Sequence, residues 1–307
     1  MMSRQMLAEV GRLRLIKDHR DYRTLHWTAE MDGPWSPAAV ERYVTGGYDG
    51  LLYRPPRGVE HRSLEFLLEL PGLRSLTVHC HVADDSAVNE FATLEHLELL
   101  TRSTVPLAVD RLHQLQNLVV DARQDLSGVR GLTGLEALYV AGWRGTDLSF
   151  LGEKSSLRRI RLDGRPTRLQ LDGIEACTAL TSLEVLDHRI PTMTPLRGLT
   201  HVETILVSGP RRMPADNDLD LSDLSAMQDL RSLRLIAAGM IRSLHPVAAL
   251  TRLRDFRLNE VVIGDGDLSP LFRLPRWTEV VPPTRFVDDP GRYSHTLAEL
   301  RTLTQRH

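Results

Sequence analysis

The chain contains 307 residues, of which 42% are hydrophobic, so it can bury a core, and wholesale disorder is excluded. Its formal net charge of −2 excludes a global electrostatic attraction to nucleic acid or to an anionic membrane. Cys80 and Cys177 lie far apart, which excludes a disulfide framework and a cysteine pair that binds a metal.

The sequence carries no apolar run long enough for a signal peptide or a membrane span. We therefore expect a cytoplasmic protein with reduced thiols. Lys17 and Lys154 are the only lysines among 38 basic residues, a bias that suggests a GC-rich, bacterial genome.

Residues 1–47 are predicted to cap the N-terminal end of the fold. The segments RLRLIK (12–17) and TLHWTAE (24–30) are interpreted as short strands. Ser36 followed by Pro37 predicts the start of a helix, which has Val40, Tyr43 and Val44 on one face.

A repeated pattern of apolar-x-x-apolar-x-apolar dominates residues 48–282. Tyr48, Leu51 and Tyr53 form a degenerate first copy, and nine clear copies follow. Spaced 20 to 28 residues apart, the nine copies begin at Leu73, Leu94, Leu115, Leu135, Leu157, Leu180, Val202, Leu230 and Leu253. One strand and one turn cannot bury their own leucines, whereas stacked copies make a continuous core. The repeat therefore predicts a solenoid.

A second motif precedes most of these copies. DLSGVRGLTGL (125–135), DLSFLGEKSSL (147–157) and DLSPLFRLPRW (267–277) are variants of it. Its apolar residues are about three apart, the spacing of an inward-facing helical or 3₁₀ turn. Asp or Thr before the Ser supplies a side-chain oxygen that caps the turn. Glu153 and Lys154 are expected on the convex side of one such turn.

Residues 283–307 are predicted to form a second cap. Trp277 begins a fading last copy of the repeat, and a Pro-rich loop follows it. Ser294 is predicted to begin a helix with Leu297, Leu300 and Leu303 along one side.

The longest interval between copies contains an extra stretch at 209–219, which is either a recognition loop or tolerated surface variation.

The repeats and turns together resemble the leucine-rich-repeat family, in the short bacterial form seen in internalin-like proteins. The resemblance covers residues 48–282, between the caps at 1–47 and 283–307. It implies an α/β solenoid in which parallel β-strands line a concave face and short helical or 3₁₀ turns form the convex face. It also implies recognition of a protein partner, most often across the concave sheet.

One position departs from the family pattern, which usually has Asn three residues after the last apolar strand residue. Here that position is occupied by His81, Arg102, Arg123, Trp143, Arg165, His188, Pro210, Ala238 and Val261. The preceding residue is often small, as at Gly142, Gly164 and Gly209. We therefore expect a sharp backbone bend at the small residue and a following side chain that points outward.

Residues that alternate with the buried strand positions define the predicted concave surface. Its central column is Thr77, Glu98, Val119, Tyr139, Arg161, Glu184, Leu206, Arg234 and Arg257. Tyr139, Arg159 and Arg161 are predicted to form a patch of the residue types that dominate binding hot spots. Asp121 and Asp163 could instead pair with arginines across neighbouring strands, which would make the patch an ordinary solvated surface. The full set of predicted partner-binding residues is Glu98, Asp121, Tyr139, Trp143, Arg159, Arg161, Glu184, Arg234 and Arg257.

The sequence offers little for metal binding or for catalysis. His79, Cys80 and His81, with Glu98 in the next copy, carry metal-ligand chemistry, but Cys80 would point away from both histidines. We expect surface histidines with a buried thiol, and no metal or cofactor. No nucleophile elbow, phosphate loop or metal-binding helix motif occurs in the sequence. We therefore expect no catalytic residues.

The sequence thus predicts a non-catalytic protein–protein recognition module that binds another protein or peptide, and neither nucleic acid nor a membrane. An immunity-type inhibitor of a toxin enzyme is one alternative. Another alternative is an accessory enzyme acting on a peptide substrate, which a cluster of perturbed carboxylates or histidines in a true pocket would favour.

Overall fold

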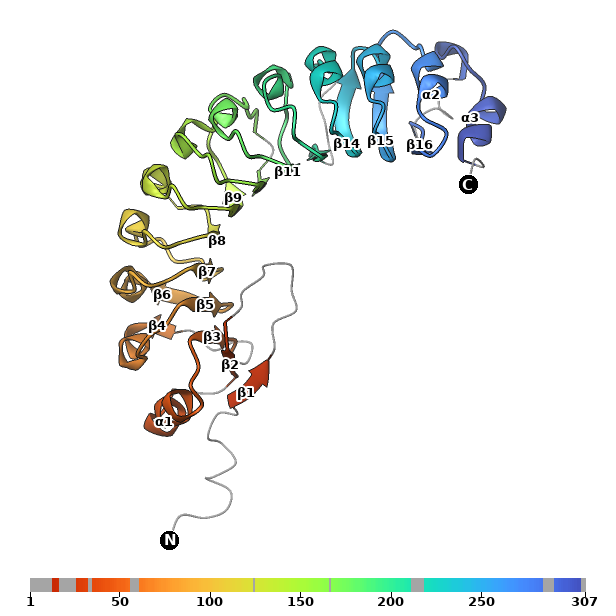
Figure 1. Ribbon diagram of the computed structural model, residues 1–307. Helices are drawn as coiled ribbons and strands as arrows, with labels where there is room; N and C mark the ends of the chain where they lie inside the picture. Colours follow the sequence, from red (N-terminus) through yellow and green to blue (C-terminus); the bar gives the residue numbers. More distant parts are fainter. Residues whose placement is uncertain are drawn as a thin grey trace. The chain divides into compact units, whose positions relative to one another are not determined.

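The computed structural model describes residues 13–16, 26–32, 35–55, 61–123, 125–165, 167–210, 218–283 and 290–304. The chain divides into two compact units, Met1–Ala141 and Gly142–His307. Each unit is a stack of repeats, with strands on one side and 3₁₀ turns on the other (Figure 1). Within the described residues, no helix combines the length and the apolar character needed to cross a membrane.

The first unit contains a sheet with the order β1-β2-β3-β5-β7-β8-β9. The β1–β2 pair is antiparallel and the later pairs are parallel. Its strands are β1 (Leu13–Ile16), β2 (Thr28–Met31), β3 (Gly50–Tyr53), β5 (Ser75–Val78), β7 (His96–Leu99), β8 (Asn117–Asp121) and β9 (Ala137–Trp143). Two further short strands, β4 (His61–Ser63) and β6 (Val82–Asp84), pair with each other in parallel.

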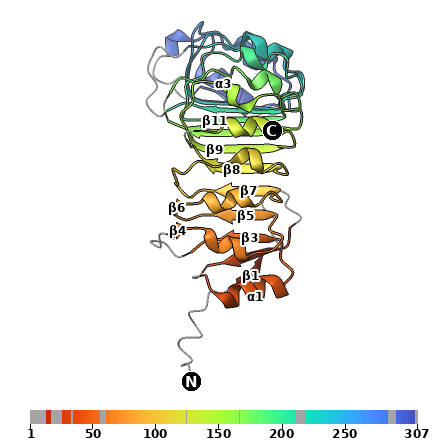
Figure 2. The same ribbon diagram turned by 90° about the vertical axis from the view of Figure 1, so that its left-hand side faces the viewer.

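The turns of the first unit lie on one face of this sheet, in front of strands β3, β5, β7 and β8 in Figure 2. They follow the helix α1 (Pro37–Thr45) and comprise η2 (Glu65–Glu69), η3 (Ser86–Glu90), η4 (Val109–Arg111) and η5 (Ser127–Gly131). Ser36 caps α1 as predicted, because its hydroxyl oxygen accepts a hydrogen bond from the Ala39 amide at 3.3 Å. Tyr43 is buried, but Val44 is exposed, so the expected apolar face of α1 is one residue narrower.

The second unit repeats the same plan with the strand order β10-β11-β12-β14-β15-β16, all in parallel, and β13 pairs with β14. Its strands are β10 (Arg159–Gly164), β11 (Ser182–Leu186), β12 (Thr204–Ser208), β13 (Asp218–Leu219), β14 (Ser232–Ile241), β15 (Asp255–Ile263) and β16 (Glu279–Val281). Its helices and turns are η6 (Ser149–Leu151), η7 (Ile174–Ala176), η8 (Thr194–Leu196), η9 (Ser222–Ala226), η10 (His245–Ala249), α2 (Ser269–Arg273), η12 (Pro290–Arg292) and α3 (Leu297–Thr304).

The C-terminal helix begins three residues later than predicted. Thr296, and not Ser294, caps α3: its hydroxyl oxygen accepts from the Glu299 amide at 3.3 Å, and the Glu299 carboxylate accepts from the Thr296 amide at 2.7 Å. This reciprocal pair is a capping box, which satisfies two backbone donors at once. Ser294 instead donates its hydroxyl hydrogen to Asp267. The prolines at 282 and 283, which begin the predicted Pro-rich loop, are among the described residues.

Most of the predicted 209–219 insertion, residues 211–217, lies outside the described residues.

The core of each unit is the column of apolar repeat positions, as predicted. Leu138 of β9 and Leu183 of β11 are 2% and 0% exposed. Cross-strand register aligns equivalent positions, since Leu118 pairs with Leu138, and Leu183 pairs with Ile205. Each repeat therefore buries its leucines against the next repeat rather than within itself.

Where the DLS motif occurs, its Asp caps the element that follows, as predicted: the 3₁₀ turns η5, η6 and η9 and the short helix α2. Carboxylate oxygens of Asp125, Asp147, Asp220 and Asp267 accept hydrogen bonds of 2.8–2.9 Å from the amide two residues on. The Ser149 hydroxyl and amide stabilise the ionised carboxylate and so lower the pKa of Asp147. Lys154, predicted on the convex surface beside one of these turns, is instead fully buried. Its ammonium group donates to the Glu153 carbonyl oxygen at 3.3 Å.

At the bend after each strand, most of the side chains that were predicted to point outward are buried instead. At the position where the family has Asn, the buried residues are Arg123, Trp143, His188, Pro210, Ala238 and Val261, whereas His81, Arg102 and Arg165 are exposed. The expectation that these side chains point outward is therefore wrong for six of the nine. Before four of the six buried residues the backbone is left-handed, with φ of 79° at Gly142, 61° at Asp187, 47° at Ala237 and 54° at Glu260. At these four positions the left-handed turn directs the next side chain back into the interior. Gly164 and Gly209, where a sharp bend was also predicted, do not have a positive φ.

Candidate partner-binding surface

The candidate binding surface is the face of each sheet that points away from the 3₁₀ turns, called the sheet face below. Its side chains stand in columns because parallel pairing brings equivalent repeat positions together. In the first unit the central column runs Glu30, Leu52, Thr77, Glu98, Val119 and Tyr139. In the second unit it runs Arg161, Glu184, Leu206, Arg234, Arg257 and Val281. The register thus reproduces the predicted column within each unit.

Charged residues of the second unit form a ladder of ion pairs across this face. Arg161 Nη1 lies 3.2 Å from Glu184 Oε2 on the next strand. Asp255 accepts from Arg234 Nε at 2.6 Å and from Arg257 Nε at 2.7 Å. Burial of Asp255 raises the pKa of its carboxyl, but hydrogen bonds from the two arginines outweigh that effect and bring the pKa below its usual range. Leu206, in the middle of the column, is apolar and half-buried.

In the first unit, Glu98 pairs with His79, which directly follows the neighbouring strand β5. Its Oε1 lies 2.5 Å from His79 Nε2. Cys80 is half-buried, and burial raises the pKa of its thiol to about 11, so the thiolate that would bind a metal is disfavoured. Among the residues that the structure describes, there is no group of three His, Cys, Asp or Glu side chains that could hold a metal ion.

The predicted hot-spot residues have different environments. Tyr139 lies on the sheet face of the first unit and is half-buried, whereas Arg159 and Arg161 are both exposed on β10 in the second unit. Trp143 is buried, and its ring packs against Phe150 with a centroid distance of 4.5 Å. It was predicted in the binding surface, but the bend directs it into the interior.

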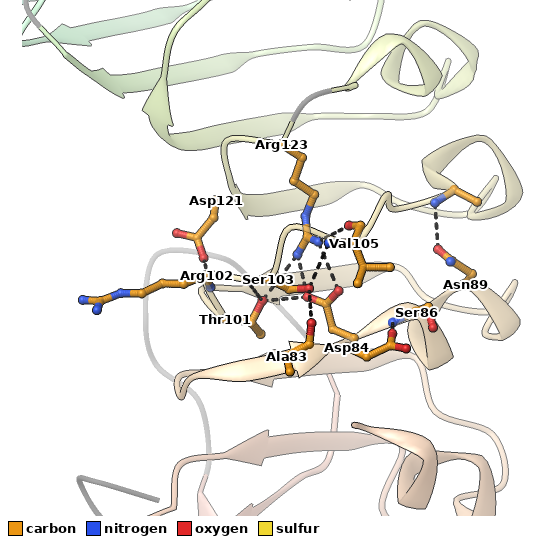
Figure 3. A network of polar contacts seen from close by, with 12 residues as sticks. Ala83, Asp84, Ser86, Asn89, Thr101, Arg102, Ser103, Val105, Asp121 and Arg123 are labelled. Atoms are coloured by element: carbon orange, nitrogen blue, oxygen red, sulfur yellow. Dashed lines mark hydrogen bonds and ion pairs between the residues drawn. The ribbon is translucent and has the colours of Figure 1, made fainter. Parts of the chain in front are cut away.

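Among the residues that the structure describes, Asp121 acts at a bend and makes no cross-strand ion pair with an arginine. Its Oδ2 accepts a hydrogen bond from the Arg102 backbone amide at 2.6 Å. Arg102 has a φ of 57°, in the left-handed region that is unfavourable for a residue with a side chain. The carboxylate therefore stabilises a strained turn (Figure 3).

A buried polar network in the first unit was not predicted from the sequence. Arg123 donates to both carboxylate oxygens of Asp85, at 3.1 and 2.6 Å, and to the Val105 carbonyl oxygen at 2.7 Å. Thr101 donates its hydroxyl hydrogen to Asp85 at 2.6 Å. Figure 3 shows Arg123, which follows β8, reaching toward Thr101 and Val105 of the preceding repeat. The signal available in the sequence was Arg123 itself, a cation at the position where the family satisfies backbone groups with Asn.

Comparisons with known proteins agree with this geometry. No protein-family model and no curated protein sequence matches the chain. Among solved structures, an internalin from Listeria monocytogenes matches with a TM-score of 0.54 and 18% identity, over 75% of this chain and 73% of the internalin. A leucine-rich-repeat protein from Leptospira interrogans matches with a TM-score of 0.57 and 13% identity, over 91% of this chain and 88% of that protein.

A third match is the leucine-rich-repeat ectodomain of the plant receptor kinase GASSHO1/SCHENGEN3 from Arabidopsis thaliana, solved in complex with Casparian strip integrity factor 2. Its TM-score is 0.50 and its identity 14%, over 81% of this chain and 31% of the ectodomain. At identities this low, the likeness concerns the fold. The chain therefore has the leucine-rich-repeat fold that its sequence resembles, and it shares that fold with a bacterial internalin.

Proposed function

We propose that this protein is a non-catalytic recognition module that binds a partner protein through its sheet face. The observation that carries the proposal is the column Arg161, Glu184, Leu206, Arg234 and Arg257, which stands on a sheet whose opposite side is packed with leucine. A surface held in this way is ordered before binding, so little conformational entropy is lost when a partner docks.

The composition of this column suits a protein partner. Its arginines offer planar guanidinium groups that can bind carboxylates in a bidentate manner, and Leu206 offers an apolar contact at the centre. The ion pairs along the column are partly exposed: the Arg161 side chain is 44% exposed and Arg234 is equally so. Such surface pairs contribute only about 0–1 kcal/mol each, so a partner can exchange them for its own charges at small cost.

The titrating groups of the protein support a non-catalytic role. Asp84, Asp125, Asp147, Asp220 and Asp267 all have a lowered pKa, and in each case a serine hydroxyl or amide of a turn is among its causes. Structural hydrogen bonds therefore account for these shifts, whereas a catalytic acid or base requires a group tuned toward neutral pH.

We also propose a protein or peptide as the partner class, in place of nucleic acid or a membrane, and a cytoplasmic location. The net charge of −2 supports the first proposal, since nucleic-acid binding relies on a positive surface. The free thiols of Cys80 and Cys177 suit a reducing compartment. Fractionation of the native host, with detection of the protein by antibody, tests the location.

The experiment for the sheet face compares variants in capture of a partner from the native host, followed by titration of the identified partner. Tyr139→Ala, Arg161→Ala and Arg234→Ala should each weaken binding at least ~10-fold, the loss expected for hot-spot residues. Their melting temperatures should stay within about 2 °C of the parent value, because all three side chains lie outside the leucine core.

Two exposed residues on the turn side serve as matched controls. Glu153→Ala and Arg197→Ala should leave the affinity unchanged. Arg197 makes a surface ion pair with Asp223 at 3.3 Å, so its variant also controls for loss of one such pair. If the controls abolish binding while the sheet-face variants retain it, the partner docks on the turns and the proposal is wrong.

A further inference from the structure

A basic hollow of about 830 Å³ opens in the second unit, apart from the column of the sheet face. It is lined by Arg231, Thr251, Arg252, Arg254 and Trp277. All five residues lie just before or at the points where the chain enters β14, β15 and β16. The hollow therefore occupies the edge of the sheet at which these strands begin.

The stacking of repeats creates the concentration of positive charge. The Arg254 amide donates to the Arg231 carbonyl oxygen at 2.7 Å, and the Glu279 amide donates to the Arg254 carbonyl oxygen at 2.7 Å. Arg231 and Arg254 thus occupy the same position of successive strands, which are about 4.8 Å apart. Like charges at neighbouring positions of a sheet repel each other and destabilise the pair. Glu203, before the preceding strand, offsets this repulsion only in part, because it lies beside Arg231 and makes no ion pair with Arg254 among the described residues.

Trp277 is the second unusual feature of the hollow. It occupies the repeat position at which Leu230 and Leu253 are fully buried, yet it is 61% exposed. The neighbouring Thr278 is turned inward instead: it is 2% exposed, and its hydroxyl donates to the Leu253 carbonyl oxygen at 2.6 Å. The last repeat therefore presents to solvent a large ring at a position that otherwise belongs to the core.

The arginines of the hollow have capacity for an additional anion. Arg231 Nη1 lies 3.5 Å from Glu203, and Arg252 pairs with Asp229, but the arginine side chains are about half exposed or more. Within the described part of the chain, the guanidinium of Arg254 makes no hydrogen bond and no ion pair, and it is exposed. One guanidinium is thus unmatched, and two others hold weak surface pairs that an incoming carboxylate can replace.

We propose that this hollow binds an acidic segment of a protein, with its carboxylates on Arg231 and Arg254 and an apolar or aromatic side chain against Trp277. Guanidinium groups match carboxylates in a planar, bidentate geometry, and tryptophan and arginine are the residue types enriched in binding hot spots. Glu203 and Asp229 stand beside the arginines and repel any anion, and this repulsion is strongest for the densely charged chain of a polyphosphate. Separate carboxylates of a peptide can instead match separate guanidinium groups.

The test uses the full chain and a fluorescein-labelled peptide with five glutamates around one tyrosine, measured by fluorescence polarisation at low salt. A glutamine peptide of the same length is the control ligand. The glutamate peptide should bind, and binding should weaken as salt is added. Arg254→Gln and Trp277→Ala should each weaken it at least ~10-fold. Arg111→Gln, which removes an exposed arginine of the first unit, should have no effect.

Several results would overturn the proposal. Equal binding of the glutamine peptide, no binding of the glutamate peptide at low salt, or equal losses in Arg111→Gln would each exclude a charge-specific site in the hollow. Tighter binding of a single-stranded oligonucleotide, lost in Arg254→Gln, would assign the hollow to nucleic acid instead. Far-UV circular dichroism of each variant confirms that it is folded, which the exposure of both replaced side chains favours.

The hollow and the sheet face can be tested separately, because they share no residue. Arg234→Ala should leave affinity for the glutamate peptide unchanged, because Arg234 lies in the central column and does not line the hollow. If the peptide binds but sheet-face variants keep full affinity for the captured partner, the hollow stands and the sheet-face proposal fails. The reverse pattern would reject the hollow alone.

Discussion

Replacing Asp85 with alanine tests whether a buried ion pair holds three successive repeats of the first unit together. The Asp85 side chain is 0% exposed and that of Arg123 is 1% exposed. In the variant, the partners that the guanidinium keeps among the described residues are the Val105 carbonyl and the Thr101 hydroxyl. Its charge is then buried without compensation. Breaking a buried pair from one side typically costs about 3–5 kcal/mol, a large share of the ~5–15 kcal/mol that stabilises a typical domain.

The assay is urea unfolding at neutral pH, followed by far-UV circular dichroism, together with amide hydrogen exchange to locate the opening. Asp85→Ala should lower the urea midpoint and increase exchange in β6, β7 and β8, because each repeat depends on its neighbours. The double variant Asp85→Leu/Arg123→Met replaces both charges with apolar groups. It should recover most of the lost stability, since a well-packed apolar pair often equals a buried ion pair.

An exposed ion pair of the same unit provides the control. Arg111 Nη1 lies 3.7 Å from Glu90 Oε1, and both side chains are 63% exposed. Arg111→Met should therefore cost no more than about 1 kcal/mol. If Asp85→Ala unfolds at the parent midpoint, or if the double variant is no more stable than Asp85→Ala, burial of an unpaired charge does not limit stability here and the reasoning is refuted.

Three further outcomes follow from the core and the bends. Leu138→Ala and Leu183→Ala should each cost ~2–5 kcal/mol in urea unfolding, and an unchanged midpoint would show that the repeat register is wrong. Gly164→Val should destabilise the protein, because a Cβ there would overlap the His188 ring. Gly142→Val should also destabilise it, because the φ of 79° at Gly142 is left-handed. A melting temperature equal to that of the parent protein for either variant would contradict these reasons. Burial lowers the pKa of His188 from 6.5, so the fold favours the neutral ring. The stabilisation from neutral His188 is fully present above about pH 6.5 and is lost at lower pH, because the unfolded chain takes up the proton first. His188→Gln should flatten this part of the profile when melting temperature is measured against pH.

The local architecture was determined by the sequence alone. The spacing of apolar residues identified buried positions such as Leu138 and Leu183. Successive side chains of a strand point to opposite faces, so the alternation of apolar and polar residues in the sequence shows which face is buried. The DLS motif likewise determined the turn caps, since Asp125 and the amide of Ser127 are only two residues apart. Such interactions need no distant partner, so a single repeat contains all the information.

Only the tertiary structure decided where the polar and aromatic exceptions lie. Arg123 is buried because Asp85, 38 residues earlier, reaches it through the stacking of repeats. Trp277 is exposed in a position that buries leucine elsewhere, and Lys154 is buried on a side that the pattern predicts to be exposed. The direction of such side chains depends on which groups neighbouring repeats place beside them, and a periodic pattern does not specify that. The candidate column could therefore be predicted, whereas the buried network and the basic hollow became visible only after the repeats had been stacked.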